Sequence, residues 1–226
     1  MDRELFVYLY TVSIPLIPVI IGGYNYAKIS KSLKYLYFFV VLGALAELSN
    51  FLMSKVFGIH HNMPIGNVYF FFAFLLLGLY FKYLYKGFIQ QKYIVTLIVV
   101  YEVCFVANLV FIQSISEYPA LLKGIGDLMV LSLVVVFFHK TMLEAKHERI
   151  WQEPLIYINL AILLYFSGSL FYSILFNLVI EYAASFAVFS QNYFYVLNGV
   201  FYLLIARGFW KAGKQKVDKG NRLIVE

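Results

Sequence analysis

Four ionisable side chains interrupt the long apolar runs of this chain, and they are the first clue to its chemistry. Glu47, Glu102, Lys123 and Asp127 each lie within a run long enough to cross a membrane. A charge at the centre of a bilayer costs about 2.5–3.5 kcal/mol on insertion scales. Lys123 and Asp127 are four residues apart, so they can pair on one helix face. We expect all four side chains to face a bundle interior, where they either fix packing or line a ligand or ion pathway.

Other polar residues recur at helical spacing around these charges. Gly43, Glu47, Asn50 and Ser54 share one helix face, and a similar stripe starts at Gln191. Small hydroxyls such as that of Ser169 fit packing better than ligand binding, because they let helices approach closely. The residues predicted to bind a ligand or to line an ion pathway are Glu47, Asn50, Glu102, Lys123, Asp127, Gln191, Tyr195 and Asn198.

Several enzyme and cofactor classes lack the residues that they require. None of the four histidines lies deep within an apolar run, which argues against haem, a zinc site or a histidine-assisted nucleophile there. A retinal protein needs a lysine within its last span, and Lys211 lies beyond that span. We therefore predict that the chain is not an enzyme and has no catalytic, cofactor-binding or metal-binding residues. The alternative is an intramembrane carboxylate enzyme that uses Glu47 and Glu102.

Seven apolar runs position these residues, and each is close to the roughly 20 residues that cross a bilayer core. The chain of 226 residues is 62% hydrophobic and 13% charged, with a mean hydropathy of +0.79, unlike an ordinary soluble domain. We predict an all-α polytopic membrane protein with one transmembrane domain (residues 1–210), a basic cytoplasmic tail (211–226) and spans at about 5–27, 34–57, 66–86, 93–113, 119–139, 155–179 and 186–208.

The basic residues fall almost entirely on one side of these spans. Fifteen of the 18 lysines and arginines lie in the loops after spans 1, 3 and 5 or after span 7. The positive-inside rule then predicts an outside N-terminus and a cytoplasmic C-terminus. The net charge of +6 is explained by loops that meet an anionic inner leaflet, and not by nucleic-acid binding. Lysine outnumbers arginine by 14 to 4, and we favour a bacterial inner membrane.

The predicted topology places most deep polar residues in the outer half of the membrane. Glu47 and Glu102 lie near mid-span, while Asn50, Lys123 and Asp127 lie further outward. This distribution predicts an outward-opening polar pocket with carboxylates at its floor. Tyrosine and phenylalanine, which contribute most of the 20% aromatic content, supply its walls and the interfacial anchors.

Spans 3 and 7 resemble each other. Residues 67–86 and 192–211 both run 20 residues from an asparagine to a lysine without a gap, with Lys82 opposite Arg207. Three positions are identical, so the likeness is either coincidental or the trace of a duplication. A duplication would make spans 1–3 and 5–7 parallel repeats joined by span 4, a 3+1+3 arrangement known among transporters.

Residues 157–172, YINLAILLYFSGSLFY, resemble a passage of small seven-helix membrane proteins of Bacteroidota, whose pattern is approximately WINxGILIYFSGNLF. The resemblance extends to Asn192–Trp210 and Glu47–Asn50, and it departs at Tyr157, Ala161 and Ser169. Such proteins often occur near sensor kinases, so the resemblance implies signalling but assigns no catalytic residue. The seven-span layout is also similar to that of sugar-transporting triple-helix-bundle proteins, although their Pro-Gln signatures are missing.

Two functional hypotheses follow. The first is a sensory or accessory receptor that binds a small molecule in the outward pocket and signals through a separate cytoplasmic partner, such as a sensor kinase. The short charged segments outside the spans favour it, because we find no attached output domain. The second is a small-solute transporter of the 3+1+3 type, with proton coupling through Glu47 or Glu102. The lipid bilayer is the expected environment for both, and self-association into a homo-oligomer is compatible with both.

The topology prediction can be tested with a reporter enzyme that is active only in the periplasm. Fused after Lys216, it should give no activity, because this position follows span 7 on the basic, cytoplasmic side. Fused after Gly58, between spans 2 and 3, it should be active. The reverse pattern of activity would overturn the topology.

Overall fold

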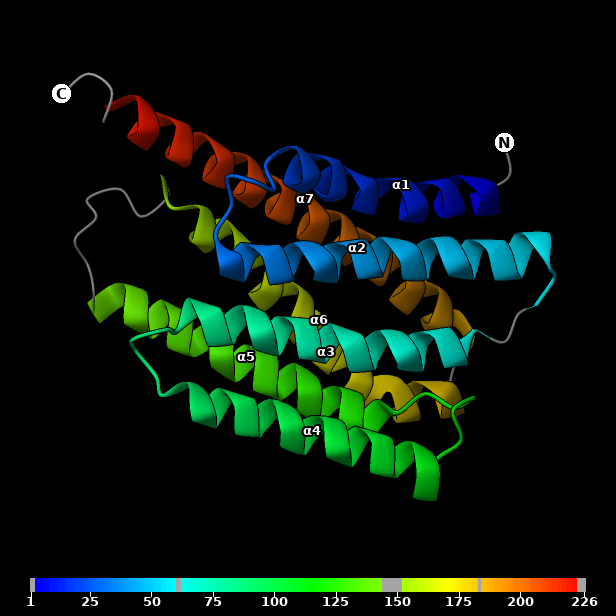
Figure 1. Cartoon of the computed structure of the whole chain (residues 1–226). Coiled ribbons are helices and arrows are strands. Elements are labelled where there is room, and N and C mark those ends of the chain that lie inside the picture. Colours follow the sequence, from blue (N-terminus) through cyan, green and yellow to red (C-terminus); the bar gives the residue numbers. More distant parts are fainter. Residues whose placement is uncertain (1–2, 60–61, 144–151, 183, 223–226) are drawn as a thin grey trace.

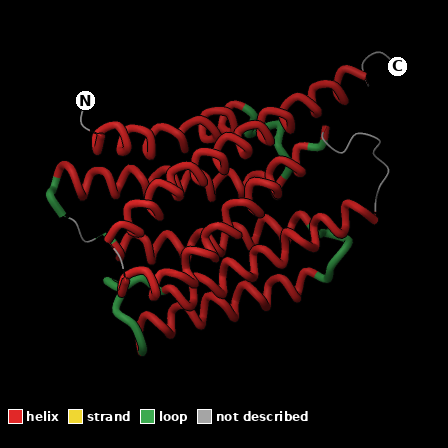
Figure 2. The backbone as a smooth tube through the Cα atoms, turned by 180° about the vertical axis from the view of Figure 1, so that it is seen from behind, coloured by secondary structure: helices red, strands yellow, loops and turns green. Residues whose placement is uncertain are grey.

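The computed structural model folds the chain into helices, and Figure 1 shows them aligned as one bundle. The structure describes the backbone of residues 3–59, 62–143, 152–182 and 184–222, and the side chains of 9–59, 62–143, 152–173 and 193–215. These backbone segments contain helices and connecting turns but no strand (Figure 2). The helices are α1 Arg3–Tyr24, α2 Lys31–Phe51 with the π-helical turn η1 Leu52–Val56, α3 Met63–Leu84, α4 Gln91–Phe111, α5 Ala120–Leu143, α6 Pro154–Tyr182 and α7 Ala184–Arg222.

The helices make the chain a multi-pass membrane protein. Five stretches are long and apolar enough to cross a bilayer: α2 with η1, α3, α4, α5, and α6 as far as Ser173. The apolar part of α1 in which side chains are described, Leu9–Tyr24, is shorter. The helix ends lie within a few residues of the predicted spans, except at the end of α7. That helix has 39 residues, about 58 Å in length, and the predicted tail from Lys211 continues it as far as Arg222.

Local sequence explains several helix ends. Ser30 caps α2, where its hydroxyl accepts a hydrogen bond of 3.4 Å from the Leu33 amide. Pro154 opens α6, at a position where its missing N–H has no cost. Gly58 and Gly87, in the turns after η1 and α3, have φ values of 65° and 87° that only glycine adopts readily. The charged segment Thr141–Trp151 is suited by its sequence to extend the helix of span 5; α5 includes it as far as Leu143, and the rest lies outside the described residues.

Six of the helices form a ring, and α4 lies outside it. Neighbours in sequence pack side by side as α1 with α2, α2 with α3, α5 with α6, and α6 with α7. Contacts between α1 and α7 and between α3 and α5 close the ring. The backbone of α4 makes its main contact with α3, and Figure 1 shows it at one edge of the bundle. The ring therefore consists of two sets of three successive helices, with the connecting helix on the outside.

The two ends of the bundle differ in charge. The turns after α1 and α3 and the ends of α5 and α7 meet at one end, here called the basic end; the opposite end is the far end (Figure 1). At the basic end, cationic side chains lie over aromatic rings, with Lys31 Nζ 4.4 Å from the Tyr83 ring centre and Lys214 Nζ 3.8 Å from that of Trp210. The others in such contacts are Lys28, Lys34, Lys82, Lys92, Lys140, Arg207 and Lys211.

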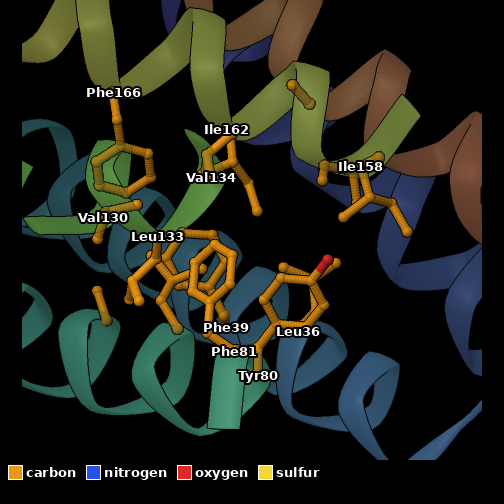
Figure 3. Close-up of a cluster of buried hydrophobic side chains, with 14 of the residues drawn as sticks. Leu36, Phe39, Tyr80, Phe81, Val130, Leu133, Val134, Ile158, Ile162 and Phe166 are labelled. Atoms are coloured by element: carbon orange, nitrogen blue, oxygen red, sulfur yellow. The ribbon is translucent and has the colours of Figure 1, made fainter. Parts of the chain in front are cut away.

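The half of the ring nearest the basic end is a mostly apolar core. Figure 3 shows buried side chains from α2, α3, α5 and α6 that meet inside the ring, in this half and towards the middle of the bundle. An internal polar contact in this core joins Asn159 of α6 to Tyr80 of α3, where the amide donates to the hydroxyl at 2.8 Å. The fully buried side chains of this region include Leu36, Val40, Tyr80, Phe81, Ile158, Ile162, Ile205 and Phe209.

Close packing of α6 against α7 in this core predicts opposite effects of two glycine substitutions. A methyl group at Gly208 would meet the Ile158 side chain and lie 3.3 Å from the Pro154 carbonyl oxygen. Gly208→Ala should therefore lower the free energy of unfolding by about 1–3 kcal/mol. Gly66→Ala, in the first turn of α3, meets open space and should raise it by up to about 1 kcal/mol. Unfolding in detergent by denaturant measures both; stabilisation by Gly208→Ala would contradict the packing.

Candidate ligand site at the Lys123–Asp127 ion pair

The predicted pairing of Lys123 with Asp127 is present in α5. Lys123 Nζ donates to both carboxylate oxygens of Asp127 at 2.6 Å. The side chains of the lysine and the aspartate are only 12% and 2% exposed. Lys123 Nζ also donates to Ser169 Oγ of α6 at 2.5 Å, so the pair is fixed to the neighbouring helix. An ion pair this deeply buried depends on such additional hydrogen bonds to offset its desolvation.

Aromatic rings surround the ion pair. Lys123 Nζ lies 5.5 Å from the ring centre of Phe70 in α3 and 5.8 Å from that of Phe166 in α6. These are cation–π distances, and the rings favour the ammonium while shielding it from lipid. The lysine and the aspartate line a cavity of about 30 Å³, enough for one or two water molecules. Its other lining residues are Phe39, Tyr69, Phe70, Ala73, Phe74, Leu77, Tyr101, Gly126, Val130, Tyr165 and Phe166.

The loop between α4 and α5 covers the site on the side of the far end. The Tyr118 hydroxyl shares a hydrogen bond of 3.2 Å with Ser173 Oγ of α6, and its ring packs edge-on against Phe70 at 6.0 Å. Burial raises the pKa of Tyr118 above its ordinary value, so the hydroxyl stays protonated near neutral pH. We call residues 112–119 the capping loop.

Hydrogen bonds hold the capping loop in this position. The Asn67 side chain of α3 donates to the carbonyl oxygens of Ile115 and Glu117, at 2.6 and 3.1 Å. Gln113 donates to the Tyr118 carbonyl oxygen at 3.0 Å and accepts from Asn108 of α4 at 3.1 Å. The loop is therefore an ordered cover, joined by side chains to both α3 and α4.

Glu47 lies near the site, across a group of tyrosines. Tyr69 of α3 and Tyr165 of α6 line the cavity, and both are close enough to Glu47 and Asp127 to interact electrostatically with each carboxylate. Tyr202 of α7 is also within reach of Glu47, and its hydroxyl would be 2.7 Å from a Cβ at Gly43, one turn before Glu47. Buried tyrosine side chains thus lie within electrostatic range of both acidic groups.

The remaining predicted site residues do not meet at this cavity. Glu102 of α4 is 8% exposed, and neither of its carboxylate oxygens has a hydrogen-bond partner among the described residues. The buried side-chain oxygen of Asn50 likewise has no partner there. In α7, the Tyr195 carbonyl oxygen accepts from Tyr10 of α1 at 3.1 Å, and Asn198 is half-buried. Gln191 belongs to α7, but its side chain lies outside the described residues.

Sequence analysis missed several residues of the site. It interpreted Ser169 as a packing residue, whereas its hydroxyl contacts Lys123 directly. It did not single out Tyr69, Phe70 or Phe166, because 20% of the chain is aromatic and no local signal separates site rings from lipid-facing ones. A usable signal was the recurrence of Tyr165, Ser169 and Ser173 at intervals of four residues, which places them on one face of α6.

Comparisons with known proteins find no relative for this chain: no protein-family model, no curated protein and no solved structure matches it. The side chains that the structure describes also contain no group of three histidine, cysteine or acidic residues placed to hold a metal ion.

The buried ion pair predicts strong coupling between its two members. Asp127→Leu leaves the Lys123 ammonium buried without its carboxylate, and should lower the free energy of unfolding by about 3–5 kcal/mol. Lys123→Met should have a similar cost. The double variant Lys123→Met/Asp127→Leu removes both charges, and should recover most of this loss. Denaturant unfolding of all four proteins gives the coupling free energy; additive losses would show that the two charges do not stabilise each other.

Proposed function

We propose that the protein is a seven-span membrane receptor with its N-terminus outside and its C-terminus in the cytoplasm. In this proposal a small molecule enters from the far end and binds at the Lys123–Asp127 pair. Its binding moves the capping loop and changes the packing of the bundle. The basic end passes this change to a separate cytoplasmic protein such as a sensor kinase.

The observation that carries the proposal is the difference between the two halves of the ring, one with the buried ion pair and one filled mostly by apolar side chains. The ion pair, Ser169, Tyr118 and Asn67 lie towards the far end. Towards the basic end, the ring is filled by apolar side chains with no exposed surface, such as Ile158 and Phe209. A ligand that reaches the ion pair thus meets a closed floor, which suits a receptor better than a passage.

The basic end offers a surface for the signalling partner. A groove of about 350 Å³ opens there between the α1–α2 turn, the start of α6 and the end of α7. Its lining mixes charged and polar side chains, Lys28, Ser30, Glu153 and Gln215, with the apolar residues Ile29, Leu33, Pro154, Leu155 and Ala212. Around it lie the lysines stacked on aromatic rings, whose charge also attracts anionic lipid.

A small-solute transporter is the second candidate, and the ring supports it. The ring consists of two sets of three successive helices, with α4 on the outside. A 3+1+3 parallel repeat would give the same arrangement. The capped cavity at one end and the groove at the other could be two ends of one pathway. Such a pathway requires the mostly apolar core between the cavity and the groove to open.

Two measurements separate these functions. Proteoliposomes loaded with buffer and exposed to a pool of radiolabelled metabolites should bind ligand without accumulating it if the protein is a receptor. Accumulation of any solute above the bound amount would establish the transporter. Purification from native membranes should recover a cytoplasmic partner; repeated recovery of the chain alone would contradict the signalling proposal.

We expect the Glu47 side chain to be needed for the response to ligand and to contribute little to the free energy of unfolding. Glu47→Leu replaces a half-buried carboxyl with an apolar side chain, so the free energy of unfolding should change by less than about 1 kcal/mol. The response should be lost, because Glu47 is electrostatically close to the tyrosines beside the ion pair. The response is measured as a shift in the fluorescence emission of Trp210, in a Trp151→Phe background that leaves it as the single tryptophan. The fractions of growth medium used are those that shift this emission when Glu47 is present. A less stable variant with a full response would make Glu47 a packing residue.

A further inference from the structure

We propose that the ligand of the Lys123–Asp127 site is a zwitterion with an apolar side chain, in the chemical class of the hydrophobic α-amino acids. This inference rests on the receptor proposed above and names its ligand class. It joins three features of the site: paired opposite charges, a wall of aromatic rings, and a cover that closes over a cavity too small for the ligand.

The first argument is charge balance. Lys123 and Asp127 carry opposite charges and contact each other at 2.6 Å, so the pair adds no net charge to the interior. A ligand with one charge would leave an uncompensated charge in a region shielded from water, which costs several kcal/mol. A ligand with one ammonium and one carboxylate adds no net charge. It can form four alternating charges with the pair, and each charge then keeps a partner.

The second argument is that each pole of such a ligand finds a matching environment. A ligand carboxylate beside Lys123 would also be within reach of the Ser169 hydroxyl, which already contacts the lysine at 2.5 Å. A ligand ammonium beside Asp127 would lie among the rings that line the cavity, including Tyr69 and Tyr165. Aromatic faces stabilise ammonium groups, and two rings already do so for Lys123.

The third argument concerns the ligand's side chain. Apart from the ion pair, the lining consists of aromatic rings, small or aliphatic residues and tyrosine hydroxyls, among them Phe39, Phe74, Leu77 and Val130. Ligand sites of this kind combine apolar walls with a few polar groups that set orientation. A polar ligand side chain would lose its hydration against these walls, whereas an apolar one gains from burial.

The cavity of about 30 Å³ is smaller than the proposed ligand. It has room for one or two water molecules, so an amino acid can enter only if the cover moves. Tyr118 joins the capping loop to the site, because its ring packs against Phe70 of the cavity lining and its hydroxyl bonds to Ser173. In this proposal ligand entry breaks the Tyr118–Ser173 hydrogen bond, which couples binding to displacement of the capping loop.

The test compares four probes that share a phenyl group and differ in charge. They are L-phenylalanine, 2-phenylethylamine without the carboxylate, 3-phenylpropionate without the ammonium, and neutral 3-phenyl-1-propanol. Calorimetric titration of the full chain in lipid nanodiscs should give the tightest binding for phenylalanine. Each analogue should bind at least about tenfold more weakly, because it leaves one pole of the site or all of it unmatched.

The double variant Lys123→Met/Asp127→Leu is the matched control, because it removes both charges together. Phenylalanine should lose its advantage over 3-phenyl-1-propanol in this variant, while Phe111→Leu, an exposed position at the end of α4, should leave all four affinities unchanged. Tyr118→Phe, which lacks the hydroxyl bonded to Ser173, should speed phenylalanine association in stopped-flow measurements.

The outcomes separate this inference from the proposed function. Equal binding of a singly charged or neutral analogue would overturn the ligand class and leave the site in place. Failure of all four probes, while growth-medium fractions still shift Trp210 emission, would also overturn the class and leave the receptor standing. Preference for phenylalanine that survives in the double variant would place its binding elsewhere and overturn the inference.

Discussion

The burial of one lysine and one aspartate in a bundle otherwise rich in apolar side chains constrains much of the structure around them. Separately, either charge would be costly to place inside the membrane; together at 2.6 Å they form a neutral unit. That unit still needs hydrogen-bond partners and protection from lipid. Ser169 of α6 supplies the first, and the rings of Phe70 and Phe166 supply the second. The pair therefore requires α5 to lie between α3 and α6, which is its position in the ring.

The two halves of the ring follow different packing rules. Towards the basic end, interlocking aliphatic and aromatic side chains leave no exposed surface on residues such as Leu36, Ile162 and Ile205. Dense cores of this kind resist deformation because small displacements create voids or overlaps. Towards the far end, hydrogen bonds between side chains, loop and helices replace much of this packing, and they can be exchanged for bonds to water or to a ligand. Rearrangement of side chains and of the capping loop is therefore easier around the ion pair than in the apolar core.

The sequence predicted this fold well where the signal is local. Apolar run length located the helices, and the four-residue spacing predicted the ion pair. Neighbour relations were harder, because spans that are apolar on every side carry little information about which face meets which helix. The contact of Ser169 with Lys123 and the position of α4 outside the ring are such relations. The length of α7 was not predicted, because basic residues such as Lys211 end an apolar run but do not end a helix.

The position of α4 has a mechanical consequence. Its C-terminal end continues directly into the capping loop, and Asn108 near that end is bonded to Gln113. Its backbone contacts α3 chiefly, with the Tyr101 hydroxyl reaching the Leu122 carbonyl oxygen of α5 at 3.2 Å. Because α4 has fewer backbone contacts with other helices than the members of the ring have, fewer contacts oppose its displacement. The helix reaches from one end of the bundle to the other. A shift of the capping loop that moved α4 along its axis would therefore also move Gln91 and the preceding turn at the basic end.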